Sequence, residues 1–194
     1  MSEQNSSFFA LLWRMKYINR WGLMRNTLPE NIKEHSLSVA LLSHALAVIG
    51  NEIYGKGYDE DLVCSLSLYH DAPEILTGDL PTPVKYNNPE ISSAYKAIET
   101  VSTEKLLSLL PERFQGHYRR YFAPGNTPEC AVVRAADKLA AYIKCVEEYN
   151  AGNREFLKAE KQILKTLGEN NLEEVAYFIE HFIPAFRLTL DELE

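Results

Sequence analysis

The chain has 194 residues, of which 46% are hydrophobic and 24% charged, and its net charge of −7 with a pI near 5.3 is acidic. These values predict one soluble globular domain and argue against a nucleic-acid backbone as the main partner. We expect no signal peptide, because no basic stretch precedes an apolar run, and no membrane span, because no uninterrupted run of about 18 apolar residues occurs. Three cysteines without a Cys-x-x-Cys spacing indicate reduced, buried thiols in a cytoplasmic protein.

Two helices separated by a loop are predicted near the N-terminus. Residues 7–18 carry apolar side chains at helical spacing, and a stop signal follows at Gly22. Residues 32–53 are apolar nearly all round, which predicts a central helix with neighbours on every side. His35 lies in its first turn, and His44, nine residues later, faces the opposite side at about 100° per residue.

A third helix is predicted over residues 60–72, and it ends in an adjacent histidine and aspartate, His70-Asp71. Pro73 has no N–H, and its ring crowds the carbonyl group four residues back. The helix should therefore kink or stop just after the His-Asp pair. Such a break would free the pair, and Glu74 behind it, to point into a cavity.

The second half of the chain also predicts helices. Residues 77–85 contain two prolines and a glycine and predict an ordered loop, whereas the polar residues 111–126 show no clear pattern. Four further helices are predicted: 89–110, 127–149 with Thr127 as N-cap, 154–168, and 171–187 with Asn171 and Glu174 at capping-box spacing. Because no segment alternates as a strand does, the chain is predicted to be all-α.

Four polar residues stand out in these apolar, helix-like segments: His35, His70, Asp71 and Asp137. Burial of such side chains needs a compensating partner. Imidazole and carboxylate are ligands of Zn, Mn, Co and Fe, so a bound divalent cation would explain the set. Ligands from several helices can build such a site in a bundle, and four protein ligands would leave a position for an activated water.

Taken alone, the candidate site residues have ordinary explanations, and so do Arg20 and Trp21 in the loop before the second helix. His35 fits a cap-region residue, Asp137 a paired buried aspartate, Trp21 a core aromatic and Arg20 a surface charge. The order of the set favours the metal site, because a His, a His-Asp pair and an Asp fall on separate apolar helices. The remaining histidines are interpreted as structural or surface residues: His44, His117 and His181.

The order His35, His70-Asp71, Asp137 resembles the HD-domain metal-dependent phosphohydrolases. Longer segments resemble the bacterial 5′-deoxynucleotidases of the YfbR type more closely, and the most specific of them spans residues 69–86. The other matching segments are 18–26, 34–37, 136–148 and 183–192. Two departures are Pro73, where a small polar residue is expected, and residues 111–126, which do not match.

The resemblance implies an HD-domain helical bundle over residues 1–194. It also implies a cytoplasmic hydrolase that removes phosphate from 2′-deoxyribonucleoside 5′-monophosphates by means of an activated water. One divalent cation per subunit (Co, Mn, Zn or similar) and a homodimer belong to the same implication, and neither a nucleic acid nor a membrane is expected as a partner. The ligands implied for the cation are His35, His70, Asp71 and Asp137.

The resemblance also assigns roles around the cation. Glu74, together with Asp71, is implied in catalysis, where Glu74 acts on the water or on the leaving 5′-oxygen. Arg20 would bind the phosphate, because its fork of donors matches the oxygens, and Lys85 would add charge nearby. Trp21 would pack against the sugar and exclude a 2′-hydroxyl. Asp79 would accept a hydrogen bond from the 3′-hydroxyl.

Three other readings stay open. The same site can serve a nucleoside triphosphate or a phosphodiester, although the small number of arginines and lysines near the motifs favours a monophosphate. A metal-binding oxygenase would need two irons and more histidines near the pair. A catalytically silent metal- or ligand-binding helical module would show no turnover with any metal.

Overall fold

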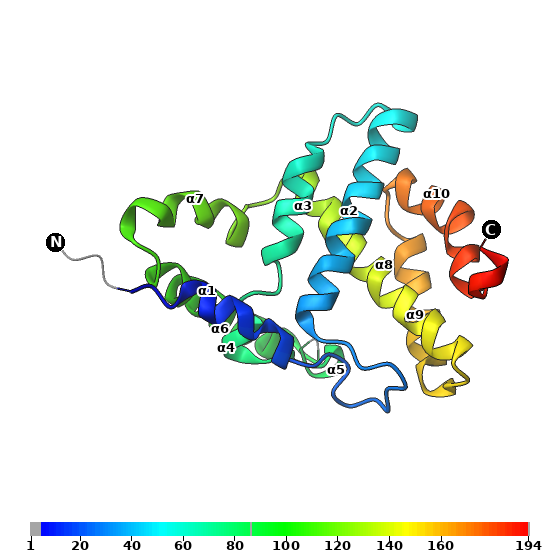
Figure 1. The fold of residues 1–194 in the computed structure, drawn as a ribbon, viewed down its shortest axis with the longest axis horizontal. Coiled ribbons are helices and arrows are strands. Elements are labelled where there is room, and N and C mark those ends of the chain that lie inside the picture. Colours follow the sequence, from blue (N-terminus) through cyan, green and yellow to red (C-terminus); the bar gives the residue numbers. More distant parts are fainter. Residues whose placement is uncertain (1–4, 86, 194) are drawn as a thin grey trace.

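The computed structural model describes residues 5–85 and 87–193, which form helices joined by turns and loops (Figure 1). This part of the chain contains no β-strand, and a single isolated antiparallel bridge joins Asn19 to Asn31. The α-helices are α1 (Phe8–Leu12), α2 (Ile32–Tyr54), α3 (Glu60–Tyr69), α4 (Glu74–Thr77), α5 (Thr82–Lys85), α6 (Pro89–Ser108), α7 (Glu112–Phe122), α8 (Pro128–Asn150), α9 (Leu157–Gly168) and α10 (Glu173–His181). Four 3₁₀ helices are η1 (Trp13–Tyr17), η2 (Arg154–Phe156), η3 (Ile183–Arg187) and η4 (Leu190–Glu192). The all-α prediction is confirmed.

The larger hydrophobic core lies among α2, α3 and α8, with α9 and α10 packed on one side of them (Figure 1). Its innermost side chains are inaccessible to solvent, among them Leu46, Val63 and Leu139. Each such burial contributes roughly 1.5–3 kcal/mol to folding, so these three helices are held firmly relative to one another. A smaller cluster joins α1 to the end of α6 through Phe8, Leu106, Leu107 and Leu110.

Helix α2 starts and ends as its sequence indicates. The Asn31 side chain accepts hydrogen bonds from two backbone N–H groups of the first turn, and the Glu34 carboxylate accepts from the Asn31 N–H, which completes a capping box. The helix ends at Gly55, whose φ of +64° is easily adopted by glycine. This well-defined start fixes the position of His35 in the first turn.

One face of α2 is exposed to solvent, so the prediction that this helix has neighbours on every side is wrong. Leu37 and Leu41 are 57% and 67% exposed. His44 faces away from His35 as predicted, and its side chain is 52% exposed. Within the described residues α2 is the one helix long and apolar enough to cross a membrane. The sequence contains no uninterrupted apolar run of that length, so the expectation of no membrane span did not single out this helix. The core helix of a globular protein passes the same test, and α2 packs against α3, α8 and α10.

The predicted break at Pro73 is confirmed. Helix α3 ends at Tyr69 rather than at residue 72, and residues 70–73 form a turn before α4 begins at Glu74. The Ala72 N–H donates to the Tyr69 carbonyl over 3.1 Å, so the turn is closed by its own backbone. The turn lets His70 and Asp71, which are adjacent in sequence, leave the helix in a shared direction.

Four other segments differ from the predictions. The first predicted helix is divided into α1 and η1, the predicted loop 77–85 contains α5, and the unassigned residues 111–126 contain α7. The capping box predicted at Asn171 is wrong, because α10 begins at Glu173 without a side-chain cap. Glu174 is instead fully buried and accepts a hydrogen bond from the Tyr58 hydroxyl over 2.8 Å. Tertiary packing therefore uses a carboxylate that the local pattern assigned to a cap.

The loop between η1 and α2 is closed at its base and tied to α8. The Ile32 N–H donates to the Ile18 carbonyl, and the Arg20 N–H donates to the Glu30 carbonyl, both over 2.9 Å. At the far end of the loop, the buried Glu148 carboxylate of α8 accepts hydrogen bonds from backbone N–H groups at residues 27 and 28. This loop places Arg20 against the helical core.

Candidate active site

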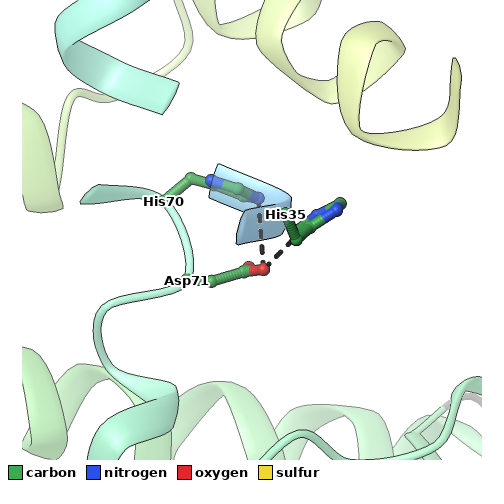
Figure 2. Close-up of side chains that lie close together, drawn as sticks. All are labelled: His35, His70 and Asp71. Atoms are coloured by element: carbon green, nitrogen blue, oxygen red, sulfur yellow. Dashed lines mark ion pairs between the residues drawn. The ribbon is translucent and has the colours of Figure 1, made fainter. Parts of the chain in front are cut away.

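Three of the four predicted metal ligands converge on one point. His35 projects from the first turn of α2, and His70 and Asp71 come from the turn after α3 (Figure 2). The Asp71 Oδ2 atom lies 3.5 Å from His35 Nε2 and 3.2 Å from His70 Nε2. One nitrogen or oxygen from each residue lies within 4.8 Å of the others, so the three residues could share one metal ion.

Asp137 of α8 brings the fourth predicted ligand, which is the second carboxylate of the set, to the same place. Its Oδ1 atom lies 3.0 Å from His35 Nε2, and its side chain is 40% exposed. Burial raises the pKa of Asp137, but the hydrogen bond with His35 and the charge of His70 outweigh it and leave the pKa below its ordinary value. Small side chains flank Asp137 on α8, since Ala136 and Ala140 are buried. Close packing at these residues allows the short side chain of Asp137 to reach α2.

The donor set fits a divalent cation. The Nδ1 atom of His70 donates to the Ser67 carbonyl over 2.7 Å, so Nε2 is the nitrogen that faces the cluster and that would bind either a proton or a cation. That Nε2 atom is buried and makes no hydrogen bond. The separations of 3.0–3.5 Å among Nε2 and carboxylate oxygens resemble the roughly 3.3 Å between donors that surround one ion at about 2.1 Å. Mixed imidazole and carboxylate ligands suit Zn, Mn, Co or Fe.

The electrostatics of the cluster favour positive charge. Burial lowers the pKa of His70, but the charges of Asp71 and Asp137 raise it to about 9. Burial also raises the pKa of Asp71, yet the charges of His70, His35 and Arg20 hold it far below its ordinary value. The carboxylates thus remain charged and stabilise whatever cation lies between them.

Glu74 lies at the first position of α4, next to the turn that holds the His-Asp pair. Its side chain is 6% exposed, and its Oε2 atom has no hydrogen-bond partner. Burial, together with the negative charges of Asp71 and Asp79, raises the pKa of Glu74 to about 9. The carboxyl group therefore carries a proton at neutral pH that it can donate.

Arg20 lies against the cluster rather than at the protein surface. Its side chain is 14% exposed, with Nε 3.1 Å from Glu30 Oε2 and Nη1 3.3 Å from Asp71 Oδ2. Its Nη2 atom lies 4.0 Å from Asp137 Oδ1. The reading of Arg20 as an ordinary surface charge is therefore wrong, and two of its nitrogens face the residues that could bind a metal.

Trp21 follows Arg20 in an unusual backbone conformation. Its φ is +59°, and it is the one non-glycine residue of the described chain in the left-handed region. The indole Nε1 donates to Glu30 Oε2 over 3.1 Å, and the ring meets Phe156 edge to face at 5.2 Å. Such strain persists only where surrounding contacts hold it, and it is concentrated at functional sites.

The two remaining predicted residues, Asp79 and Lys85, lie close enough to Glu74 for their charges to shift its pKa. Asp79 is half-buried, and burial and the charge of Asp71 raise its pKa, although the charge of Arg20 opposes this. The Lys85 ammonium lies 2.9 Å from Glu99 Oε1 and 4.4 Å from the Tyr95 ring centre. Lys85 is thus paired with α6 and is not part of the His-Asp cluster, although its charge lowers the pKa of Glu74.

A cavity of about 400 Å³ opens beside His70 and Glu74. Its other walls come from α6, including Lys96 and Thr103, and from Phe122 at the end of α7. The segment 111–126, which the sequence left unassigned, thus contributes Phe122 and Ala123 to a cavity that reaches His70 and Glu74. The helix break predicted a cavity at the His-Asp pair and Glu74, and His70 and Glu74 line this one, whereas Asp71 does not.

Glu30, Glu148 and Phe156 are site-forming residues that sequence reasoning missed. Glu30 binds both Arg20 and Trp21, Glu148 holds the loop that carries them, and Phe156 backs the indole. A buried Lys-Glu pair four residues apart on α8, Lys144 and Glu148, was the only local signal for this arrangement.

Solved structures of HD-domain phosphohydrolases share this fold. One from Listeria innocua superposes with a TM-score of 0.82 at 24% identity, covering 93% of this chain and 88% of the other. A phosphohydrolase of cyanophage S-2L, solved with dA and one catalytic Zn²⁺, superposes with a TM-score of 0.66 at 20% identity, covering 90% of this chain and 95% of the other. The fold is that of the HD-domain phosphohydrolases.

Sequence similarity narrows the class further. The family model described as 5′-deoxynucleotidase YfbR-like matches residues 7–186. A 5′-deoxynucleotidase of Vibrio vulnificus is 50% identical over 192 residues, 98% of this chain and 99% of the relative. One of Vibrio cholerae is 49% identical with the same coverage. The chain belongs to the YfbR-like 5′-deoxynucleotidase family.

Proposed function

We propose that this protein is a metal-dependent phosphomonoesterase that hydrolyses 2′-deoxyribonucleoside 5′-monophosphates to deoxynucleoside and phosphate. The observation that carries the proposal is the convergence of His35, His70, Asp71 and Asp137 beside the buried acid Glu74. Membership of the 5′-deoxynucleotidase family supports the same activity. The substrate class rests on that membership, and the chemistry rests on the cluster.

The four imidazole and carboxylate residues would hold one divalent cation, with Zn, Mn and Co as the candidates. Such a cation would neutralise phosphoryl oxygens and acidify water so that it can attack near neutral pH. The Zn²⁺ in the cyanophage phosphohydrolase supports this choice of group. Asp71 would serve both as ligand and as the charge that keeps the imidazole of His70 oriented.

Arg20 and Glu74 would act on the two ends of the scissile bond. Arg20 donates from Nε to Glu30 and from Nη1 to Asp71, so its guanidinium lies beside the cluster, where its other Nη hydrogens would donate to phosphate oxygens. Glu74 would donate its proton to the leaving 5′-oxygen, which is consistent with its raised pKa of about 9. A cation beside Asp71 would lower that pKa towards neutrality, where a general acid works best.

Trp21 and Asp79 would recognise the sugar. The indole would pack where a ribose carries its 2′-hydroxyl, and Asp79 would accept from the 3′-hydroxyl. A hydrophobic wall rejects an extra hydroxyl well only when it is rigid, and Trp21 is held from two sides by Glu30 and Phe156. Lys85 would contribute positive charge at longer range, since its ammonium is paired with Glu99.

We also propose that residues 1–194 form one HD-type domain, that the protein works in the cytoplasm and that it forms a homodimer. Light scattering after gel filtration tests the last point directly.

A second substrate class, nucleoside triphosphates or phosphodiesters, would use the same cluster. The paired state of Lys85 favours a monophosphate, because few basic groups remain for more phosphates.

The test is phosphate release from dAMP and AMP by metal-stripped protein with Mn²⁺, Co²⁺, Zn²⁺ or Mg²⁺ added back. We expect release from dAMP alone, dependent on metal and abolished by Asp137→Ala. Equal release from both nucleotides would contradict the sugar filter but retain the phosphatase. Turnover of triphosphates or diesters alone would favour the second class, and no turnover of any of them would indicate a silent binding module.

A further inference from the structure

We propose that Glu30 is a specificity-determining positioning residue, which couples the phosphate-binding arginine to the tryptophan that excludes the 2′-hydroxyl. The inference rests on the roles given above to Arg20 and Trp21. It starts from one atom: Glu30 Oε2 accepts hydrogen bonds from Arg20 Nε and from Trp21 Nε1, each over 3.1 Å. A shared acceptor fixes the distance and angle between the two side chains.

Glu30 is itself held firmly. Its side chain is 16% exposed, and its backbone carbonyl accepts from the Arg20 N–H over 2.9 Å. The next residue, Asn31, both forms the bridge with Asn19 and caps α2. The carboxylate therefore stands on the start of the same helix that carries His35. Its second oxygen lies 3.9 Å from His35 Nδ1, which is beyond hydrogen-bond distance. Glu30 therefore holds the arginine and the tryptophan close to the histidine without a hydrogen bond to it.

The backbone of Trp21 explains why such a holder is needed. A bulky residue at a φ of +59° is strained and returns to an ordinary conformation unless contacts prevent it. The Trp21 carbonyl accepts hydrogen bonds from the Met24 N–H and the Asn26 amide, and the indole ring is held by the hydrogen bond to Glu30 and the edge-to-face contact with Phe156. Without the Glu30 carboxylate, the ring would keep its apolar neighbour but lose the bond that sets its rotation.

Loss of that bond would affect sugar choice more than catalysis. The sugar filter depends on a rigid wall, because a mobile ring can yield to one extra hydroxyl. The Glu30 carboxylate accepts its hydrogen bonds from Arg20 and Trp21, and His35 Nδ1 lies 3.9 Å away, beyond hydrogen-bond distance, so the chemical step retains its groups. The arginine would lose its Nε partner, which weakens the orientation of its fork and hence phosphate binding.

The experiment compares Glu30→Ala, Glu30→Gln and the exposed control Glu52→Ala on α2. Steady-state kcat and KM are measured for dAMP and AMP with the best metal. Shielding of Trp21 is measured by acrylamide quenching in a Trp13→Phe background, because Trp13, 63% exposed, is the other tryptophan of the chain. Circular dichroism checks that each variant folds.

For Glu30→Ala we expect the dAMP-to-AMP ratio of kcat/KM to fall about tenfold or more, mostly through better use of AMP and a higher KM for dAMP. Trp21 should become more accessible to the quencher. Glu30→Gln keeps an acceptor for the indole but not the charge, so it should retain the ratio and the shielding while the KM for both nucleotides rises. Glu52→Ala should match the wild type in both readouts.

An unchanged ratio in Glu30→Ala, or a lower ratio with Trp21 as shielded as before, overturns the inference while leaving the deoxynucleotidase intact. If Glu30→Ala does not fold, Glu30→Gln decides, and an unchanged KM then overturns it. A wild type that turns over dAMP and AMP equally removes the sugar filter and the inference with it. An inactive wild type overturns the proposed function itself.

Discussion

At the scale of single residues, the carboxyl group of Glu74 is set for proton donation by its surroundings. It is buried at the start of α4, where Asp71 and Asp79 oppose its ionisation. Glu74→Gln keeps the shape but removes the transferable proton. We expect kcat for dAMP to fall by about 10²- to 10⁴-fold, with KM changed much less, as measured by phosphate release.

A matched substitution separates this effect from the loss of any other carboxyl group near the site. Glu99→Gln removes a nearby carboxylate that pairs with Lys85 and should reduce kcat only slightly. If Glu74→Gln retains more than about a tenth of the wild-type kcat, its role as the acid is contradicted.

Asp137 tests the metal site independently of turnover. Its Oδ1 atom lies 3.0 Å from His35 Nε2, the same nitrogen that faces Asp71, so Asp137 would be a direct ligand of the cation. We expect Asp137→Ala to weaken binding of Zn²⁺ or Co²⁺ at least about 100-fold in titration calorimetry, since loss of even a supporting residue costs 10–100-fold. The exposed Asp61→Ala on α3 is the control, and equal affinity in the two variants would remove Asp137 from the ligand set.

At the scale of elements, α8 holds the loop that carries Arg20 and Trp21. The buried Glu148 carboxylate binds Lys144, the Asn153 amide and the backbone N–H groups of residues 27 and 28. Burial raises the pKa of Glu148, but these hydrogen bonds outweigh it and lower the pKa from 4.5 to about 2. The loop is therefore fastened by an ionised carboxylate.

Because the folded pKa of Glu148 is depressed, its stabilisation is complete above about pH 4.5 and is lost as the pH falls towards 2. We expect Glu148→Ala to lower the free energy of unfolding by about 3–5 kcal/mol at pH 7, since it strands the buried ammonium of Lys144. In urea titrations the difference from the wild type should shrink as the pH falls through this window. The exposed Glu52→Gln on α2 should show no such convergence, and a constant difference for Glu148→Ala would refute the linkage.

At the scale of the whole molecule, a cation should tie α2, the turn after α3, and α8 together. Besides their packing in the core, these elements meet at His35, Asp71 and Asp137. A ligand at 100 times its Kd adds about 2.7 kcal/mol, which raises Tm by roughly 5–10 °C for a chain of this size. Thermal unfolding with Zn²⁺ or Co²⁺, then with a chelator, should show this shift in the wild type and not in Asp137→Ala.

Much of this architecture was predictable from local sequence. Helical periodicity located α2, α6 and α8, and the Pro73 ring located the break that turns His70 and Asp71 out of α3. The order of the candidate ligands, together with the longer motifs, indicated the family that the comparisons confirm. These signals are local, because apolar spacing, missing N–H groups and motif residues act within a few turns of the chain.

Other features were decided only by tertiary contacts. Glu174 has the spacing of a cap residue but is buried against Tyr58, and Leu37 lies in an apolar run but is exposed. The fastening of the Arg20–Trp21 loop joins residues more than 100 positions apart, which no local pattern encodes. The sequence by itself determined the helices and the residue types of the site. Only the tertiary structure decided which carboxylates would face a cation, which one holds Arg20 and Trp21 in position, and which one would donate a proton. Those roles depend on burial and on neighbours brought from distant helices.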